Sequence, residues 1–270
     1  MSKLIEIEPL TPTIGATVHG VDLAQPISDE LFAEIQAAFL EHLVLFFRDQ
    51  AMSPDDHLAF GRRFGDLHIH PAAPYRDGNP ELMAIETDKD SARNNGERWH
   101  SDVSADAEPP MASILHIFEL PSSGGDTCWS NMYAAYDRLS EPMKALLDPL
   151  TALHAADYSG YYGDHTAQRE SPHAVHPVIR THPETGKKAL FVNEVFTRRI
   201  NELSREESTS VLSFLSDHVK DVNIQCRFKW EANSVAMWDN RCTQHKAIWD
   251  YFPESRSGTR VTVQGDRPIH

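Results

Sequence analysis

The 270-residue sequence predicts a mainly β protein with flanking α-helices and a jelly-roll core. Three observations lead to this prediction: period-two alternation dominates the central and C-terminal parts, helical periodicity is confined to three stretches, and no repeat or linker divides the chain. We therefore expect a single domain over residues 1–270. A chain of this length can bury a substantial core.

The three expected helices each begin at a serine that can cap the first turn. Ser28 precedes apolar residues at helical spacing over 31–43. Ser53-Pro54 opens a second helix, since proline loses nothing at a first helical position. A capping box that starts at Ser204 predicts the third helix.

The expected strands follow from alternation and from short apolar runs. Residues 222–230 alternate between apolar and polar side chains, as a half-buried strand does. Residues 175–181 and 188–192 flank a turn at 184–186, which predicts a hairpin. The remaining strand candidates are residues 112–118, 234–238 and 259–264.

Two stretches have the polar, poorly periodic composition of lids over a site. They span residues 72–98 and 156–174 and are rich in turn-forming residues. We expect both to cover a binding pocket.

Composition narrows the function classes. Twenty-five Lys and Arg against forty Asp and Glu give a net charge of −15, which argues against nucleic acid or an anionic membrane as the main partner. Three cysteines without C-x-x-C spacing indicate a reducing compartment, and the N-terminus shows no secretory signal. We therefore expect a cytoplasmic protein. Fifteen histidines are the one compositional hint of metal chemistry.

The sharpest local motif is the H-x-D pair of His100 and Asp102. Two residues that are two apart on an extended strand point to the same face, so both could bind one metal ion. The motif is weak alone, since about one such pair is expected by chance. Non-haem Fe(II) oxygenases use two His and one carboxylate, and His245 is the best candidate for the second imidazole. A hydrogen-bonded core histidine is the alternative interpretation of His245.

Two arginines and a glycine-rich turn could bind anions beside this metal. Arg256 and Arg260 are four apart, so on an extended segment they face the same side. Guanidinium groups bind carboxylates and sulfonates through a planar fork. Thr127, after Gly124-Gly125-Asp126, offers a hydroxyl to an anion; the same segment is also a plausible simple turn.

These features together resemble the taurine dioxygenase family (TauD/TfdA) of Fe(II)/2-oxoglutarate-dependent oxygenases. The resemblance runs over nearly the whole chain, from residues 15–22 to residues 265–268. Its most specific stretches are residues 64–71, 99–103, 124–129, 190–194 and 238–245.

The resemblance implies a double-stranded β-helix, the jelly-roll of cupins, with a defined site. Its Fe(II) ligands would be His100, Asp102 and His245, with no further catalytic side chain. Thr127 and Arg256 would bind the co-substrate 2-oxoglutarate. The implied substrate-binding residues are His70, Val103 (through its backbone N–H), Ser159, Phe196 and Arg260.

The implied reaction consumes O2 and 2-oxoglutarate and hydroxylates a small anionic organosulfur compound, a sulfonate or a sulfate ester. The products would be sulfite or sulfate, an aldehyde, succinate and CO2. Relatives commonly form dimers or tetramers, so a homo-oligomer is expected. Taurine-specific relatives have larger side chains where this chain has Ala73, Gly96 and Gly160, which predicts a bulkier or less polar substrate than taurine.

Three alternatives remain open from the sequence. Relatives that cleave phenoxyalkanoates use an equivalent arginine for a carboxylate, so the same chemistry on a carboxylate is the first. The H-x-H pair of His68 and His70 is also typical of zinc enzymes, which makes a zinc-dependent hydrolase the second. A non-catalytic ligand-binding barrel is the third. The other histidines have no distinctive spacing, and most are expected at the surface or in packing.

Overall fold

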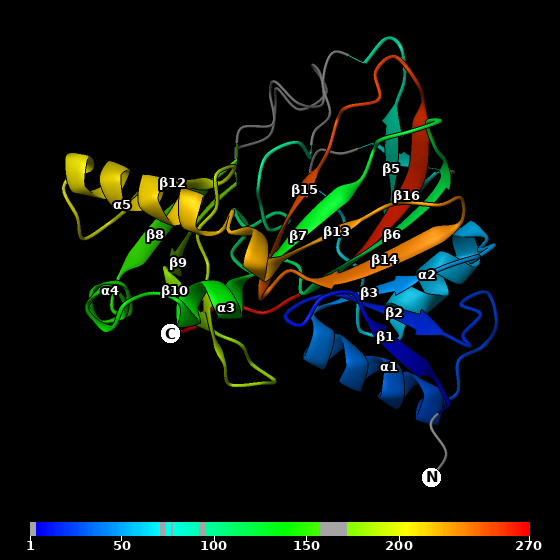
Figure 1. The fold of residues 1–270 in the computed structure, drawn as a ribbon, viewed down its shortest axis with the longest axis horizontal. Coiled ribbons are helices and arrows are strands. Elements are labelled where there is room, and N and C mark those ends of the chain that lie inside the picture. Colours follow the sequence, from blue (N-terminus) through cyan, green and yellow to red (C-terminus); the bar gives the residue numbers. More distant parts are fainter. Residues whose placement is uncertain (1–3, 71–73, 77, 92–95, 157–171) are drawn as a thin grey trace.

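The computed structural model describes residues 4–70, 74–76, 78–91, 96–156 and 172–270. An eight-stranded sheet, here called the main sheet, has the strand order β1-β2-β3-β14-β6-β16-β5-β4 (Figure 1). Its strands are β1 (Glu6–Pro9), β2 (Ala16–His19), β3 (Val44–Phe47), β4 (Tyr75–Arg76), β5 (Asn79–Thr87), β6 (Ala112–Glu119), β14 (Ser234–Asp239) and β16 (Arg256–Val263). The predicted mainly β jelly-roll fold is confirmed.

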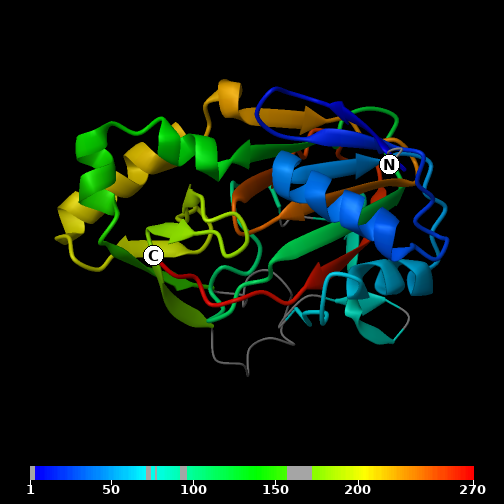
Figure 2. The same ribbon diagram turned by 90° about the horizontal axis from the view of Figure 1, so that it is seen from below.

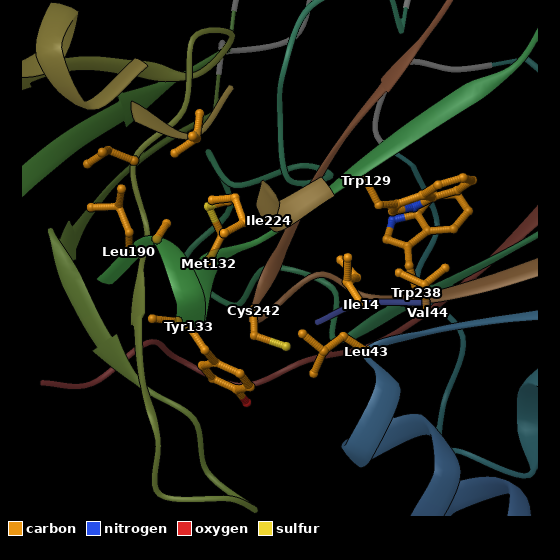
Figure 3. Packing of buried hydrophobic residues seen from close by; sticks show 14 of the residues in the cluster. Ile14, Leu43, Val44, Trp129, Met132, Tyr133, Leu190, Ile224, Trp238 and Cys242 are labelled. Atoms are coloured by element: carbon orange, nitrogen blue, oxygen red, sulfur yellow. The ribbon is translucent and has the colours of Figure 1, made fainter. Parts of the chain in front are cut away.

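A three-stranded sheet, here called the minor sheet, packs over the main sheet. Its order is β13-β7-β15, and all its pairs are antiparallel. The core between the sheets is aromatic: Trp129 lies 5.7 Å from Trp238 between ring centroids (Figure 3), and Phe46 stacks on Phe228 at 4.0 Å. The minor-sheet strands are β7 (Thr127–Asn131), β13 (Gln225–Phe228) and β15 (Thr243–Ala247).

A helical layer and two small sheets complete the fold on one side. The views in Figures 1 and 2 place α3, α4 and α5 together there, whereas α1 and α2 lie at the main sheet. The elements of this side are α3 (Met132–Asp137), α4 (Glu141–Leu147), β8 (Thr151–Ala155), β9 (His173–Pro177), β10 (Ile179–Thr181), β11 (Lys188–Leu190), β12 (Thr197–Ile200) and α5 (Arg205–His218). None of the helices in the described residues is long and apolar enough to span a membrane.

The three predicted helices are confirmed, each with its serine cap. The Ser28 side chain accepts a hydrogen bond at the start of α1 (Asp29–His42). Ser53 and Asp56 form a capping box before α2 (Pro54–Arg62), and Ser204 caps α5 in the same way. The hairpin predicted around residues 184–186 is also present, as β10 paired with β11.

Two sequence predictions were wrong in part. The strand expected over 222–230 begins instead with a 3-10 turn at Val222–Ile224, because the Asp221 side chain caps it by accepting the N–H of Asn223. Val222 is 79% exposed, so the alternation there did not reflect burial.

The lid prediction over residues 72–98 was wrong for β5. This strand pairs with β16 in the main sheet, and Leu82 is fully buried. Its Pro80 and acidic side chains hide the strand pattern in the sequence. Residues 157–171, most of the second predicted lid, lie outside the described residues.

Candidate metal and co-substrate site

A backbone bridge brings the two predicted histidine ligands together. His100 and His245 form an isolated antiparallel bridge, in which each N–H donates to the other's carbonyl at 3.1 and 2.8 Å. Their rings lie 4.1 Å apart between centroids. His245 is inside β15, whereas Asp102 lies in the turn after the bridge, not on the strand that the sequence predicts. The minor sheet therefore aligns both imidazoles.

The predicted carboxylate completes the cluster. Ligand atoms of His100, Asp102 and His245 all lie within 4.8 Å of one another, and the three side chains are buried. Oδ1 of Asp102 is 3.8 Å from Nε2 of His100. A buried group of two imidazoles and one carboxylate has the composition of a non-haem Fe(II) site.

The protonation states fit a divalent metal ion. Nδ1 of His100 donates to the carbonyl of Arg98 at 2.7 Å, which leaves Nε2 with its lone pair. Burial lowers the pKa of His100, and burial together with nearby His100 lowers that of His245, so both rings are neutral. Burial alone would raise the pKa of Asp102, but the Arg260 guanidinium and the hydrogen bond from Ser113 hold that pKa below its usual range.

An orphaned guanidinium lies at the predicted 2-oxoglutarate site. Arg256 begins β16 and is 4% exposed, and its Nε and Nη2 atoms have no hydrogen-bond partner among the described residues. The guanidinium lies over the ring of Trp230, 5.4 Å from its centroid. The Trp230 indole in turn donates to the hydroxyl of Thr127 at 3.0 Å. Trp230 thus brings together the two residues that the sequence predicts to bind one carboxylate.

Arg260 makes a contact that the sequence did not predict. Its Nη1 donates to Oδ1 of Asp102 at 2.7 Å, and its Nη2 lies 3.2 Å from the sulfur of Met83. Its Nε has no hydrogen-bond partner among the described residues. Arg260 is therefore next to the candidate metal-ligand cluster, and it holds the carboxylate oxygen that faces His100.

The other predicted substrate residues gather around this point where the structure describes them. Burial and the nearby Arg260 lower the pKa of His70 to about 3, so the half-buried ring is neutral. Phe196 is buried 6.5 Å from His100 between ring centroids. Val103 is buried with φ at 48°, a conformation that is uncommon for a β-branched residue. Ser159 lies outside the described residues.

Three buried histidines support the turn after Asp102. His154 pairs with the hydroxyl of Ser104 at 3.0 Å. His68 pairs with the carboxylate of Asp106 at 3.0 Å, and His176 donates to the carbonyl of that residue at 2.9 Å. No spacing in the sequence singled out His154 and His176, since their partners are distant in the chain. Their contacts show that both are packing residues with a hydrogen-bonding role beside the site.

A second cluster of metal-ligand types, His182, Asp239 and Cys242, is a hydrogen-bond network instead. Nδ1 of His182 accepts two backbone N–H groups at 3.1 and 3.2 Å, so its Nε2 donates to Asp239 at 3.0 Å. Arg241 donates to both oxygens of Asp239. Burial raises the pKa of the Cys242 thiol well above its usual range. No imidazole lone pair remains for a metal ion there.

Two neutral imidazoles and one carboxylate leave metal positions open for small molecules, an arrangement typical of non-haem oxygenases. The jelly-roll fold with this cluster therefore defines a metal-dependent oxygenase. The comparison with known families is more specific: the chain belongs to the family described as "Taurine catabolism dioxygenase TauD, TfdA family", whose model matches residues 6–262. Members are 2-oxoglutarate-dependent dioxygenases that use O2 and a metal ion. Membership of this family rules out the two alternative interpretations, a zinc-dependent hydrolase and a non-catalytic ligand-binding barrel.

Relatives match over almost the full chain. An alpha-ketoglutarate-dependent sulfonate dioxygenase of Saccharomyces cerevisiae is 35% identical, covering 98% of this chain and 68% of the yeast protein. An alpha-ketoglutarate-dependent sulfate ester dioxygenase of Pseudomonas putida is also 35% identical, covering 98% of this chain and 91% of the relative. The crystal structure of a taurine dioxygenase from Burkholderia xenovorans matches with a TM-score of 0.88 at 37% identity, covering 99% of this chain and 93% of that chain.

Proposed function

We propose that this protein is an Fe(II)- and 2-oxoglutarate-dependent dioxygenase that hydroxylates a small organosulfur anion, either an alkyl or aryl sulfonate or a sulfate ester. The observation that supports it best is that strand β16 carries two buried arginines, one of which contacts a side chain of the metal-ligand cluster. Arg260 contacts Asp102 directly, and Arg256 lies on the same strand with two guanidinium nitrogens that have no hydrogen-bond partner in the described part of the chain. Two organic anions could pair with the two guanidinium groups, and one metal ion could bind the cluster.

The metal ligands in this proposal are His100, Asp102 and His245. Their neutral imidazoles and single carboxylate carry one negative charge, which suits a divalent ion with open positions. Fe(II) bound there would supply the oxidising chemistry, in which O2 and 2-oxoglutarate are consumed and the substrate loses a hydrogen atom.

Arg256 and Thr127 would hold the distal carboxylate of 2-oxoglutarate. Two donors of the buried guanidinium have no partner among the residues that the structure describes, and a carboxylate can accept two such donors in parallel. Trp230 limits the movement of both side chains, because it contacts each of them. The co-substrate would then reach the metal in one orientation.

Arg260, His70 and the backbone of Val103 would hold the anionic head of the main substrate. A neutral His70 can donate one hydrogen bond without adding charge. Phe196 would exclude water from the reacting carbon beside His100. The protein's contribution is to place one C–H bond at the metal and to protect it from solvent.

The substrate class follows from what hydroxylation does to a carbon attached to sulfur or to a sulfate oxygen. One atom of O2 enters succinate, as 2-oxoglutarate loses CO2, and the other becomes a hydroxyl on the substrate carbon. That adduct breaks its bond to the sulfur group and yields an aldehyde with sulfite or sulfate. Relatives named for sulfonates and for sulfate esters support this class. Gly96, small where taurine-specific relatives have a larger residue, supports a bulkier substrate than taurine.

The test uses anaerobic protein loaded with Fe(II) and 2-oxoglutarate and then exposed to O2. Taurine, longer alkyl sulfonates, alkyl sulfates and aryloxy acids are each added, and succinate, sulfite, sulfate and aldehyde are measured. The proposal predicts succinate with equimolar sulfite or sulfate, and faster turnover of longer compounds than of taurine. Asp102→Ala should abolish turnover. Turnover of aryloxy acids alone would establish the carboxylate alternative, and a preference for taurine would overturn the larger pocket.

A further inference from the structure

A chain of buried hydrogen bonds ends on the carboxylate of Asp102. It runs from Trp238 through Asn240 and Ser113, and all four side chains are buried. We propose that Asn240 and Ser113 are positioning residues that fix the carboxylate of Asp102 for metal binding. The inference deepens the proposed function, since it rests on Asp102 being a metal ligand.

The donors in this chain can point in one direction only. The Trp238 indole has no acceptor, so its N–H donates to Oδ1 of Asn240 at 3.0 Å. This fixes the Asn240 amide, whose nitrogen then donates to the Ser113 hydroxyl at 2.9 Å. The hydroxyl hydrogen of Ser113 is thereby left for Oδ2 of Asp102, 2.7 Å away. Each link determines the orientation of the next.

The hydrogen bond from Ser113 distinguishes the two oxygens of the Asp102 carboxylate. Ser113 takes Oδ2, whereas Oδ1 is the oxygen that lies 3.8 Å from Nε2 of His100. A carboxylate held in this way presents one oxygen to a metal ion. Without the serine hydroxyl, Oδ2 would lose this donor, and the carboxylate, still bound to Arg260 through Oδ1, could rotate or bind the metal through both oxygens.

Asn240 also holds the backbone of the same residue. Its Oδ1 accepts the N–H of Asp102 at 3.3 Å. Asn240 lies in the turn between β14 and β15, and β15 contains His245, while Ser113 is on β6 beside β14. The hydrogen bonds therefore connect Asp102, which lies in a turn, to β6 and to the segment that leads into the His245 strand. Groups that orient a metal ligand in this way typically contribute about 10–100-fold to metal affinity.

The test measures Mn(II) affinity of the metal-free protein by titration calorimetry, without turnover. Ser113→Ala should raise the Mn(II) dissociation constant about tenfold or more. Ser130→Ala is the matched control, because Ser130 is equally buried and its hydroxyl donates at 2.7 Å to the carbonyl of Val219 and not to Asp102. The control should stay within about twofold of the wild type, while thermal unfolding checks that each variant is folded.

A second variant keeps the test informative if Ser113→Ala perturbs packing. Ser113→Cys preserves the shape of the side chain but donates weakly, so it should also lose affinity. In the active enzyme both variants should form more succinate per molecule of substrate oxidised than the Ser130→Ala control. The inference would be overturned if folded Ser113→Ala and Ser113→Cys proteins bound Mn(II) as tightly as the wild type and formed no extra succinate per molecule of substrate oxidised.

Asp102→Ala separates this inference from the proposed function. If Asp102→Ala binds Mn(II) as tightly as the wild type does, the proposed metal centre itself is wrong. If Asp102→Ala loses Mn(II) but both Ser113 variants bind it normally, only the positioning role of Ser113 and Asn240 fails.

Discussion

His100 and His245 are paired through their backbones, with reciprocal N–H to carbonyl hydrogen bonds of 3.1 and 2.8 Å. The two residues come from distant parts of the sequence, yet the bridge sets their rings 4.1 Å apart. Because this pairing uses main-chain atoms alone, it does not depend on either imidazole. The fold should therefore persist when a ligand side chain is replaced.

The first prediction is that His245→Leu separates folding from metal binding. Nδ1 of His245 is buried without a hydrogen-bond partner among the described residues. An apolar side chain of similar size at this position should therefore cost the fold little stability. We expect a melting temperature of the metal-free protein equal to or above that of the wild type. Mn(II) affinity, measured by calorimetry, should fall by about 100-fold or more, since loss of a group that only orients a ligand already costs about 10–100-fold. Unchanged Mn(II) binding would remove His245 from the site.

The second prediction is that Arg256→Met stabilises the protein and weakens the binding of 2-oxoglutarate. A buried guanidinium without an ion-pair partner in the described residues is costly, so its replacement should raise the free energy of unfolding by about 1–3 kcal/mol. Loss of the charged donors should weaken 2-oxoglutarate roughly 10–100-fold. Urea unfolding and calorimetry with Mn(II) check the two effects. A destabilised variant with normal 2-oxoglutarate affinity would contradict the prediction.

The third prediction concerns Arg260→Gln. In the structure Arg260 competes for Oδ1 of Asp102, and its positive charge also opposes a bound cation. Its removal should tighten Mn(II) binding by about 1 kcal/mol, roughly fivefold. The main substrate should bind much more weakly, whereas 2-oxoglutarate affinity should change little. Weaker Mn(II) binding would show instead that Arg260 helps to hold Asp102 in place.

The fourth prediction is a loss of stability in acid that depends on His57. Its Nε2 donates to the carbonyl of Ile114 at 3.0 Å, and Nδ1 pairs with the Thr259 hydroxyl at 3.1 Å. Burial and the nearby His116 lower the pKa of His57 to about 3. Below pH 6.5, therefore, His57 becomes protonated in the unfolded chain but stays neutral in the folded protein. The free energy of unfolding should fall between pH 6.5 and pH 3, by up to about 1.4 kcal/mol per pH unit. His57→Gln should reduce that slope in urea unfolding, and an unchanged slope would contradict it.

What could be predicted from the sequence was local or strongly patterned. The helix starts at Ser28, Ser53 and Ser204 were predictable, because a cap needs only residues within one turn. The H-x-D pair and a distant histidine supplied the three candidate ligands that meet at the cluster, although the core-histidine interpretation of His245 stayed open until the family resemblance was considered. The resemblance to a known family added the roles of Thr127 and Arg256.

What could not be predicted depends on contacts between distant segments. Ser113 lies in an apolar run, and no local pattern shows that its hydroxyl reaches Asp102. The ion pair of Arg260 with Asp102 likewise joins β16 to a turn that is 158 residues away in the sequence. Strand β5 was taken for part of a lid, since its two buried residues, Leu82 and Met83, are adjacent and therefore show no alternation.

The fifth prediction is that Gly124→Ala impairs 2-oxoglutarate binding through the turn before Thr127. Gly124 has φ at 80°, and a Cβ there would come within 2.4 Å of the Asp250 carboxylate. That carboxylate accepts the N–H of Gly125 at 2.8 Å, so a displaced Asp250 would release the turn.

The matched control for Gly124→Ala is Gly186→Ala. Gly186 has a similar φ of 68°, but a Cβ there meets nothing within 4 Å. Both variants bear the backbone cost of a left-handed alanine, about 1–2 kcal/mol, which chemical unfolding measures. Only Gly124→Ala should also raise the dissociation constant of 2-oxoglutarate, because only it moves the segment that ends at Thr127. Equal 2-oxoglutarate affinities in the two variants would mean that Asp250 yields to the added methyl group without moving the turn.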